Sequence, residues 1–433
     1  MSTAQATAAP SSTSYRYLVA GILAVVYTFN FLDRQIISIL GKDISTDLHL
    51  TKTQFGILGG TAFALFYTVC GIPVAWLCDR GKRIAIMSVA CAIWSAFTAA
   101  CGTATGFVQI IIYRMGVGVG EAGGSPPSYS LISDYFPPKE RGVGLALYSL
   151  GVPVGSMLGA FIGQRIASAY SWRVAFYVVG VPGVLMALIM YLIVREPKRG
   201  GLDAVALGGE AHAPAPPMLQ AVGAFFAQRT LTLTAVSSAF SAFVGYAALI
   251  WNPQFLEIVK DMPKERIGDA YALTLGITGV IGTFAAGWLA DRLAHRDRRW
   301  FAWLPAISFL VSIPFWIGLL WAPTWQLALL FAAGPMLLNN MYLAPALAIV
   351  QNAVPPARRT VSGAVLLFVL NLVGLGVGPP YVGRIADAMD AAHGKASLAY
   401  GYAALIPVVV ITVLAHLAAA GSIGRDKRLA ALV

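Results

Sequence analysis

Charged residues are scarce in this chain. Asp, Glu, Lys and Arg make up 11% of its 433 residues, whereas 58% are hydrophobic, and the mean hydropathy is +0.72. A soluble protein carries about a quarter charged residues. The shortage of charge therefore excludes an ordinary soluble domain and indicates an integral membrane protein.

Groups that could support covalent or redox chemistry are also few. The sequence has no C-x-x-C motif, no Cys/His metal spacing and no Walker A motif G-x-x-x-x-G-K-[ST]. We interpret the four cysteines as small buried hydrophobes: Cys70, Cys78, Cys91 and Cys101. No catalytic triad is recognisable, so we expect no enzymatic activity, no metal and no cofactor.

Long apolar segments are abundant by contrast. Windows of about 20 apolar residues, long enough to cross a bilayer, occur twelve times. We therefore predict an all-α integral membrane protein with twelve transmembrane helices at about 17–40, 52–78, 84–105, 107–134, 142–168, 173–194, 231–258, 268–290, 300–321, 325–353, 360–387 and 397–420.

The distribution of Lys and Arg predicts how these spans are oriented. When the N-terminus is placed in the cytoplasm, the inner segments hold 19 of the 30 Lys and Arg residues and the outer loops hold 7. Cytoplasmic loops carry such an excess. We expect a multi-pass protein of the inner (plasma) membrane with both termini in the cytoplasm. The same placement explains the net charge of +11 without a nucleic-acid partner.

The longest loop divides the spans into two halves. It contains paired glycines and the proline-rich sequence Ala213-Pro-Ala-Pro-Pro217, which is typical of a linker. A short interfacial helix is expected within it, near 218–228. The predicted organisation is a disordered tail at 1–15, a six-helix bundle at 16–194, a cytoplasmic linker at 195–230, a second six-helix bundle at 231–420 and a cytoplasmic tail at 421–433.

A short motif repeats in the two halves. The second span ends with Trp76-Leu77-x-Asp79-Arg80, and the eighth span ends 212 residues later with Trp288-Leu289-x-Asp291-Arg292. Transporters built from two six-helix halves carry such internal repeats. The repeat and the twelve spans together favour a secondary transporter.

Four ionisable residues inside the spans mark the expected transport pathway. Asp33 and Arg34 lie in the first span, and Arg114 and Glu121 lie in the fourth. Charges at membrane depth are unfavourable unless they face a cavity or a pathway. Arg114 and Glu121 are seven residues apart and so share one helix face. The many glycines around Glu121 leave room beside it.

These features resemble those of the major facilitator superfamily over nearly the whole chain. The family signature after its second helix is approximately G-x-x-x-D-R-x-G-R-R, and it is matched, with one residue missing after Arg80, by Gly71, Pro73, Asp79, Arg80, Gly81, Lys82 and Arg83. Within the superfamily the chain most resembles the spinster group of lysolipid and sphingolipid transporters. The residues that carry this resemblance are Phe31-Leu-Asp-Arg34, Arg114, Gly118-Val-Gly-Glu-Ala122, Pro126 to Phe136, Arg141, Pro153-Val-Gly-Ser156 and Gly159.

The resemblance implies two pseudo-symmetric bundles, alternating access, and contact between the first and fourth spans. It also implies a gate at the cytoplasmic helix ends, with the carboxylate of Asp79 facing the N-terminus of the eleventh span, where negative charge is favourable. The expected gate residues are Asp79, Arg80, Arg83, Asp291 and Arg292.

We hypothesise that Asp33, Glu121 and Arg114 couple transport to protons. Burial and a nearby guanidinium act in opposite directions on the proton affinity of a carboxylate. Asp33 and Arg114 lie at similar depth, so they can touch if their helices are neighbours, and protonation of Asp33 would free Arg114. A static ion pair that fixes helix packing is the alternative. Arg34 points about 100° away from Asp33 and is expected to face the substrate or a different carboxylate.

The second half is predicted to supply a less charged cavity wall. Its candidate substrate or gating residues are Tyr246, Trp251, Asn339, Asn340, Tyr342 and Asn371. A cavity that is charged on one side and mostly apolar on the other suits an amphiphile better than a sugar. We therefore expect a monomeric, proton-coupled transporter of a lysophospholipid or sphingolipid-like substrate. A symporter of small organic anions (carboxylates or sugar acids) and a non-transporting membrane sensor are the alternatives.

Overall fold

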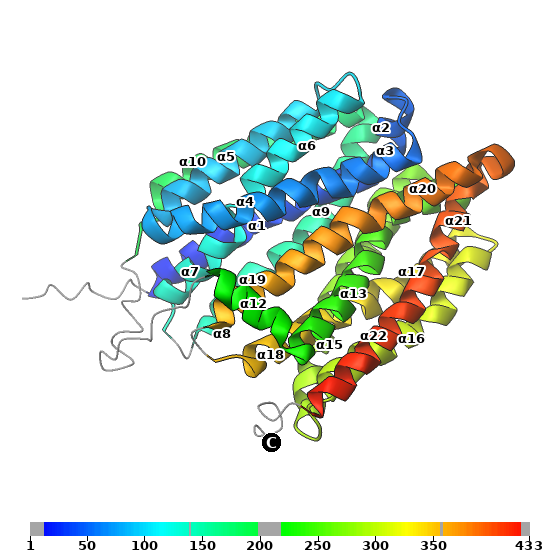
Figure 1. The fold of residues 1–433 in the computed structure, drawn as a ribbon. Coiled ribbons are helices and arrows are strands. Elements are labelled where there is room, and N and C mark those ends of the chain that lie inside the picture. Colours follow the sequence, from blue (N-terminus) through cyan, green and yellow to red (C-terminus); the bar gives the residue numbers. More distant parts are fainter. Residues whose placement is uncertain (1–12, 138–139, 198–217, 356–357, 426–433) are drawn as a thin grey trace, which may run out of the picture.

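The computed structural model describes residues 13–137, 140–197, 218–355 and 358–425, and all regular elements in these ranges are helices (Figure 1). The helices run roughly side by side along one direction. This arrangement agrees with the predicted all-α membrane fold. The predicted tails and most of the linker between the halves fall outside the described residues, so the domain boundaries stay a prediction.

The first half of the chain supplies six passes. Several of them are assembled from consecutive helices that differ in length or in hydrogen-bonding pattern. The elements are α1 (Thr13–Ile39), α2 (Gly41–Asp47), α3 (Lys52–Gly56), η1 (Ile57–Thr61), α4 (Ala62–Arg80), α5 (Arg83–Cys101), α6 (Phe107–Glu121), α7 (Ser125–Tyr135), α8 (Arg141–Ser149), α9 (Gly151–Ala169) and α10 (Trp172–Ile193).

The second half repeats this plan after α12 (Met218–Ala227), which forms where the interfacial helix is expected. Its elements are α13 (Arg229–Gln254), η2 (Phe255–Val259), α14 (Lys264–Arg266), η3 (Ile267–Tyr271), α15 (Ala272–Ala294), α16 (Trp300–Trp321), α17 (Trp325–Leu338), η4 (Asn339–Met341), α18 (Leu343–Ala353), α19 (Arg359–Val369), η6 (Leu370–Leu375), α20 (Gly376–His393), η7 (Gly394–Ala396), α21 (Ser397–Ala403) and α22 (Leu405–Ile423).

Ten helical stretches within the described residues are long and apolar enough to cross a membrane. Two features reconcile them with the twelve expected passes. The stretch Val361–Ile423 contains two passes, because the chain turns back at Gly394, which adopts a positive φ of 50°. The fourth pass consists of α6 and α7, each of which is too short to span alone.

The break between α6 and α7 positions a functional side chain. Residues 122–124 form a turn that contains two glycines, and glycine is a poor helix former. The new helix begins with prolines in its first turn, where the missing N–H is tolerated. Glu121 is therefore the last residue of α6, at the break in the middle of the pass.

The internal repeat is visible in the structure. The second pass contains the π-helical turn η1 near its start, and the eighth pass contains the π-helical turn η3 at the equivalent place. At the other end of each pass an arginine lies over a tryptophan. Arg80 Cζ is 4.1 Å from the ring centroid of Trp76, and Arg292 Cζ is 5.5 Å from that of Trp288.

Small residues bring α1 and α9 together. A stripe of glycines runs along α9, and a Cβ atom at Gly155 would overlap the backbone oxygen of Thr28 on α1. Such close approach between membrane helices requires small side chains. The glycine spacing in the sequence is thus explained by helix packing.

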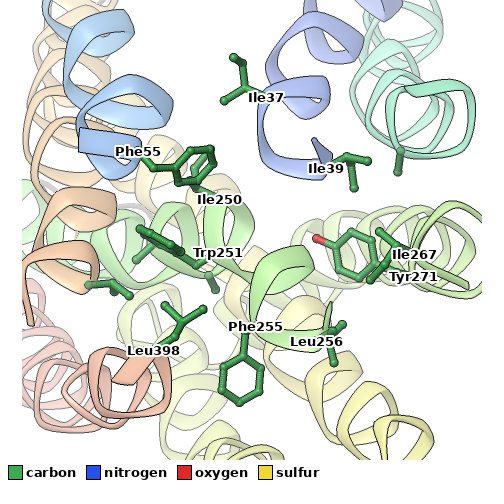
Figure 2. Close-up of a cluster of buried hydrophobic side chains, with 14 of the residues drawn as sticks. Ile37, Ile39, Phe55, Ile250, Trp251, Phe255, Leu256, Ile267, Tyr271 and Leu398 are labelled. Carbon is green, nitrogen blue, oxygen red and sulfur yellow. The ribbon is translucent and has the colours of Figure 1, made fainter. Parts of the chain in front are cut away.

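The two halves meet at one end of the bundle. We call the end where α1 begins and α22 ends the termini end, and the other the far end. A cluster of buried apolar side chains joins the halves at the far end (Figure 2). Ile37, Ile39 and Phe55 come from the first half, whereas Trp251 and Tyr271 are among those from the second.

Polar contacts reinforce this closure. Ser38 Oγ donates hydrogen bonds to the backbone oxygens of Leu249 (2.8 Å) and Ile250 (2.9 Å) across the two halves. Further inter-half ion pairs at this end join Lys42 to Glu257, Asp43 to Lys264, Lys52 to Asp390 and Arg165 to Asp269. The far end is therefore the closed end of the molecule.

Candidate functional site

Four ionisable side chains gather between α1 and α6. Asp33 and Arg34 come from α1, and Arg114 and Glu121 come from α6. Asp33, Arg114 and Glu121 are each 1–2% exposed, whereas the Arg34 side chain is 16% exposed. Buried charges at membrane depth are typical of functional sites. Among these four groups, Arg34 is the one that a ligand entering from solvent can reach.

An ion pair joins Arg34 to Glu121. Arg34 Nε donates to Glu121 Oε2 at 2.6 Å. The guanidinium also lies near three aromatic rings, with Cζ 5.0 Å from the centroid of Phe31, 4.6 Å from Phe63 and 5.0 Å from Tyr67. Cation–π contacts of this kind are strongest when they are desolvated. Arg34 is thus held by one carboxylate and a box of aromatic rings.

Asp33 and Arg114 do not form a direct ion pair in the described part of the chain. Thr98 Oγ1 of α5 donates a hydrogen bond to Asp33 Oδ2 at 3.0 Å. The guanidinium of Arg114 lies instead over Phe63, with Cζ 5.3 Å from the ring centroid. Successive residues on a helix point about 100° apart, so Arg34 meets Glu121 while its neighbour Asp33 turns toward α5.

Three of these four side chains each keep one buried polar atom that is unpaired in the described structure. Asp33 Oδ1, Arg114 Nε and Glu121 Oε1 have no hydrogen-bond partner among the described residues. The charges of Arg114, Arg34 and Glu121 nevertheless lie close enough to act on Asp33. The cluster therefore keeps unused hydrogen-bonding capacity that a water, a ligand or a proton can satisfy.

Part of the predicted second-half wall lies close to this cluster. Tyr246 on α13 donates a hydrogen bond through its hydroxyl to Asn371 Oδ1 on η6 at 3.3 Å, and it is near enough to Arg34 to interact with its charge. Tyr342 packs in the same apolar cluster as Tyr246. These three side chains thus form the polar part of the wall opposite Arg34.

The remaining candidates of the second half are distributed differently. Asn339 is 7% exposed, and its Oδ1 atom has no partner among the described residues. Asn340 is exposed, and its Nδ2 atom donates to the backbone oxygen of Met336 at 2.6 Å. Trp251 is fully buried at the far end, where Nε1 donates to the backbone oxygen of Pro379 at 2.8 Å. Trp251 therefore belongs to the closed end and not to the neighbourhood of Arg34.

The predicted cytoplasmic gate residues lie at the termini end. The side chain of Asp79 is outside the described part of the structure. Asp291 is exposed, and Arg80 and Arg292 stack on tryptophans. Their gating role stays a prediction.

Arg83 lies in a buried network inside the first half. Its guanidinium donates to Asp134 Oδ2 at 2.5 Å, to Ser130 Oγ at 2.6 Å and to Glu196 Oε1 at 2.8 Å. In this conformation Arg83 ties α5 to α7 and to the segment that follows α10.

Several residues of the site were not indicated by the sequence. Thr98 and the aromatic residues Phe63 and Tyr67 look like ordinary components of an apolar span. Asp387 at the far end accepts hydrogen bonds from the first backbone N–H groups of α3, but its position near a helix end gives no hint of a partner 334 residues away. Glu257 pairs with Lys42 of the first half, and its position in the sequence gives no hint of that partner either.

No metal centre is suggested by the geometry. Within the described residues, no group of three or more His, Cys, Asp or Glu side chains is placed to hold a metal ion.

Comparison with known proteins identifies the family. Residues 23–379 match the model of the Major Facilitator Superfamily, and the chain belongs to this superfamily. It is therefore a multi-pass membrane protein and a secondary transporter, not an enzyme. These conclusions confirm the fold class and the superfamily predicted from the sequence.

Within the superfamily the chain is spinster-like, as its motifs predict. A bacterial homologue of the human lysosomal transporter Spinster, solved in an inward-facing, unoccupied conformation, is 29% identical and superposes with a TM-score of 0.84, covering 96% of this chain and 99% of that one. An MFS-type efflux pump of Mycolicibacterium smegmatis is 31% identical over 88% of this chain and 87% of its own length. A hexuronate transporter of Bacillus subtilis is 27% identical over 88% and 90%.

Proposed function

We propose that this chain is a proton-coupled secondary transporter that moves an amphiphilic, lipid-like substrate by alternating access. The favoured class is a lysophospholipid or sphingolipid-like molecule. The observation that carries the proposal is the Arg34–Glu121 ion pair, which lies inside an aromatic box beside the buried carboxylate of Asp33.

Arg34 is assigned to the headgroup of the substrate. Its guanidinium is the most exposed of the four central charges, and planar guanidinium groups bind phosphates and carboxylates with two parallel hydrogen bonds. Tyr246 and Asn371 offer further hydrogen-bonding atoms from the opposite half. A headgroup bound to Arg34 would compete with the carboxylate of Glu121 for the same N–H groups.

Proton coupling follows from this competition. A carboxylate that loses its cationic partner in an apolar site takes up a proton, because an isolated charge is very unfavourable there. Glu121 would meet this condition when the substrate occupies Arg34. Asp33 is the main proton acceptor in this proposal, with Thr98 as its neutral partner and Arg114 as the cation that responds to its charge.

Alternating access would rock the two halves about the central cluster. The contacts between the halves at the far end support an inward-facing state, in which the termini end opens to the cytoplasm. The similarity to an inward-facing structure supports the same assignment. We place the protein in the plasma membrane with both termini in the cytoplasm.

A symporter of small organic anions is the second candidate. The similarity to a hexuronate transporter favours it, since Arg34 or Arg114 could hold a carboxylate of a sugar acid. The aromatic residues around Arg34 favour the amphiphile, because a sugar acid needs many hydrogen-bonding partners and aromatic rings offer few.

Uptake in proteoliposomes distinguishes the two classes. We expect the wild-type protein to move a labelled lysophospholipid and not a labelled hexuronate. Arg34→Gln removes the headgroup contact and, at about 1.5–3 kcal/mol for a charged hydrogen bond, lowers uptake by about ten- to hundredfold. Arg266→Gln, which removes an exposed charge far from the site, serves as control. Uptake of hexuronate without uptake of lysophospholipid would instead identify the protein as a symporter of small organic anions.

A further inference from the structure

The repeated Trp–Arg motif ends an exposed apolar stripe on each of two transmembrane helices. On the second pass the exposed apolar residues Leu65 and Val69 continue the same stripe as Trp76, which is 54% exposed. On the eighth pass Ile281 and Phe284 precede Trp288, which is 62% exposed. Exposed apolar stripes on transmembrane helices face the hydrocarbon of the bilayer, and tryptophan favours its edge.

The same motif lies away from the contact between the two halves. On α4, Ala64 approaches Gly376 of the other half, and Trp76 follows twelve residues later. On α15, Gly276 packs against Met157 of the other half, and Trp288 again follows twelve residues later. Twelve residues correspond to a rotation of about 120° on an α-helix. Both tryptophans therefore lie well to the side of the interface between the halves.

Each tryptophan presents an arginine that has no acidic partner among the described side chains. Arg80 and Arg292 are exposed, follow their tryptophans by one helical turn, and lie over the indole rings at 4.1 and 5.5 Å. Neither forms an ion pair with any residue that the structure describes. A guanidinium that lies over an indole ring is attracted by a cation–π contact and keeps its positive charge beside the tryptophan.

We propose that these two Trp–Arg pairs bind the headgroups of anionic phospholipids, one lipid in each half, at the termini end of the bundle. The guanidinium contacts the phosphate, and the indole packs against the glycerol and the upper acyl chain. The leaflet on the cytoplasmic side carries the anionic lipids that such basic sites attract. Pseudo-symmetry gives the two halves equivalent sites, so bound lipid steadies both helix ends as the halves rock.

Native mass spectrometry of the full-length protein tests the proposal. We would titrate phosphatidylglycerol and phosphatidylcholine separately into detergent solution and count bound lipids. The double variant Arg80→Gln/Arg292→Gln is expected to bind two phosphatidylglycerol molecules about fivefold more weakly each. Phosphatidylcholine binding should not change. Arg296→Gln is the matched control, because Arg296 is an exposed arginine near the same helix end that stacks on no tryptophan in the described structure.

A second measurement locates the lipid independently of the charge. Phosphatidylglycerol with brominated acyl chains quenches the fluorescence of tryptophans it touches, and the quenching should fall in Trp76→Phe/Trp288→Phe but not in Trp321→Phe. Trp321 is 83% exposed and lies at the far end, without a stacked arginine among the described residues. Equal weakening in Arg296→Gln, unchanged phosphatidylglycerol binding in the double arginine variant, or equal quenching in both tryptophan variants would overturn the proposal.

Discussion

The carboxylate of Asp387 stabilises the closed far end, and its contribution can be measured as a change in the fraction of molecules in which this end is closed. It lies on α20 of the second half and accepts hydrogen bonds from the backbone N–H groups of Lys52 (2.9 Å) and Thr53 (2.7 Å), the first residues of α3 in the first half. These N–H groups have no partner within their own helix. The partial positive charge of the helix N-terminus favours a carboxylate at this position.

The backbones are also unusually close here. A Cβ atom at Gly383 would overlap the backbone of Lys52, so α20 and the start of α3 touch directly. The contact exists only while the far end is closed, because rocking the halves apart would separate the two helices. Any change in its strength should therefore appear as a change in the ratio of inward-facing to outward-facing molecules.

Asp387→Asn should open the far end. Asparagine keeps one acceptor oxygen and loses the negative charge, so one charge-assisted hydrogen bond is lost. Hydrogen bonds to charged groups contribute about 1.5–3 kcal/mol, and Asp387 is partly exposed, which favours the lower limit. A loss of about 1.5 kcal/mol raises the outward-facing fraction about tenfold.

Asp390→Asn is the matched control. Asp390 lies one turn further along α20 and pairs with Lys52 Nζ at 2.7 Å, but its side chain is 50% exposed. Such surface ion pairs contribute about 0–1 kcal/mol, so the outward-facing fraction should change less than about fivefold. Pulsed electron spin resonance between labels at Thr46→Cys and Ala391→Cys, in a background without native cysteines, reports the distance across the far end. Equal distance distributions for the two variants would refute the reasoning.

Three further predictions concern stability and coupling. Gly155→Ala should destabilise the protein by about 1–3 kcal/mol, because α9 must move away from α1. Gly21→Ala is the control, since a Cβ atom at Gly21 would meet no atom within 4 Å. Thermal melting in detergent compares the two variants. A hydrogen bond from Arg173 lowers the pKa of Asp47 outside the spans, so that pair stabilises the fold above about pH 4 and the contribution is lost as pH falls further. Asp47→Asn should therefore lower the melting temperature slightly at pH 7, and the difference from the wild-type protein should shrink as the pH is lowered below about 4. Thr98→Val should move the pH midpoint of uptake upward, because the hydroxyl favours the ionised form of the carboxylate it contacts, and Thr98→Ser should restore it.

The span pattern and the family could be predicted because both depend on local sequence. Hydropathy is summed over a window of neighbouring residues. The motif from Trp76 to Arg80, repeated from Trp288 to Arg292, can likewise be recognised without knowing which helices are in contact. Even the break in the fourth pass has a local cause in the glycines and prolines that follow Glu121.

The pairing of the central charges could not be predicted in the same way. The sequence placed Asp33, Arg34, Arg114 and Glu121 inside the membrane but left open how neighbouring helices are rotated. A rotation of about 100° decides whether Arg34 or Asp33 faces α6. Because Arg34 does so, it pairs with Glu121, and Asp33 meets Thr98, whose type and position carried no signal.

The far-end contacts were missed for a different reason. Asp387 and Glu257 lie near helix ends, where charged residues are common and usually solvated. Their partners come from the other half of the chain, and only the docking of the two halves brings them together. The position of Trp251, a candidate substrate or gating residue, depended on the same unknown docking, which places this side chain in the closed end.

The most direct test of proton-coupled transport is lysophospholipid movement in proteoliposomes under an imposed pH gradient, compared between wild type and Asp33→Asn. We predict that the gradient drives net accumulation by the wild-type protein. The variant, whose residue 33 can no longer exchange a proton, should equilibrate the substrate without accumulating it. Gradient-driven accumulation that survives in Asp33→Asn would contradict the assignment of Asp33 as the main proton acceptor.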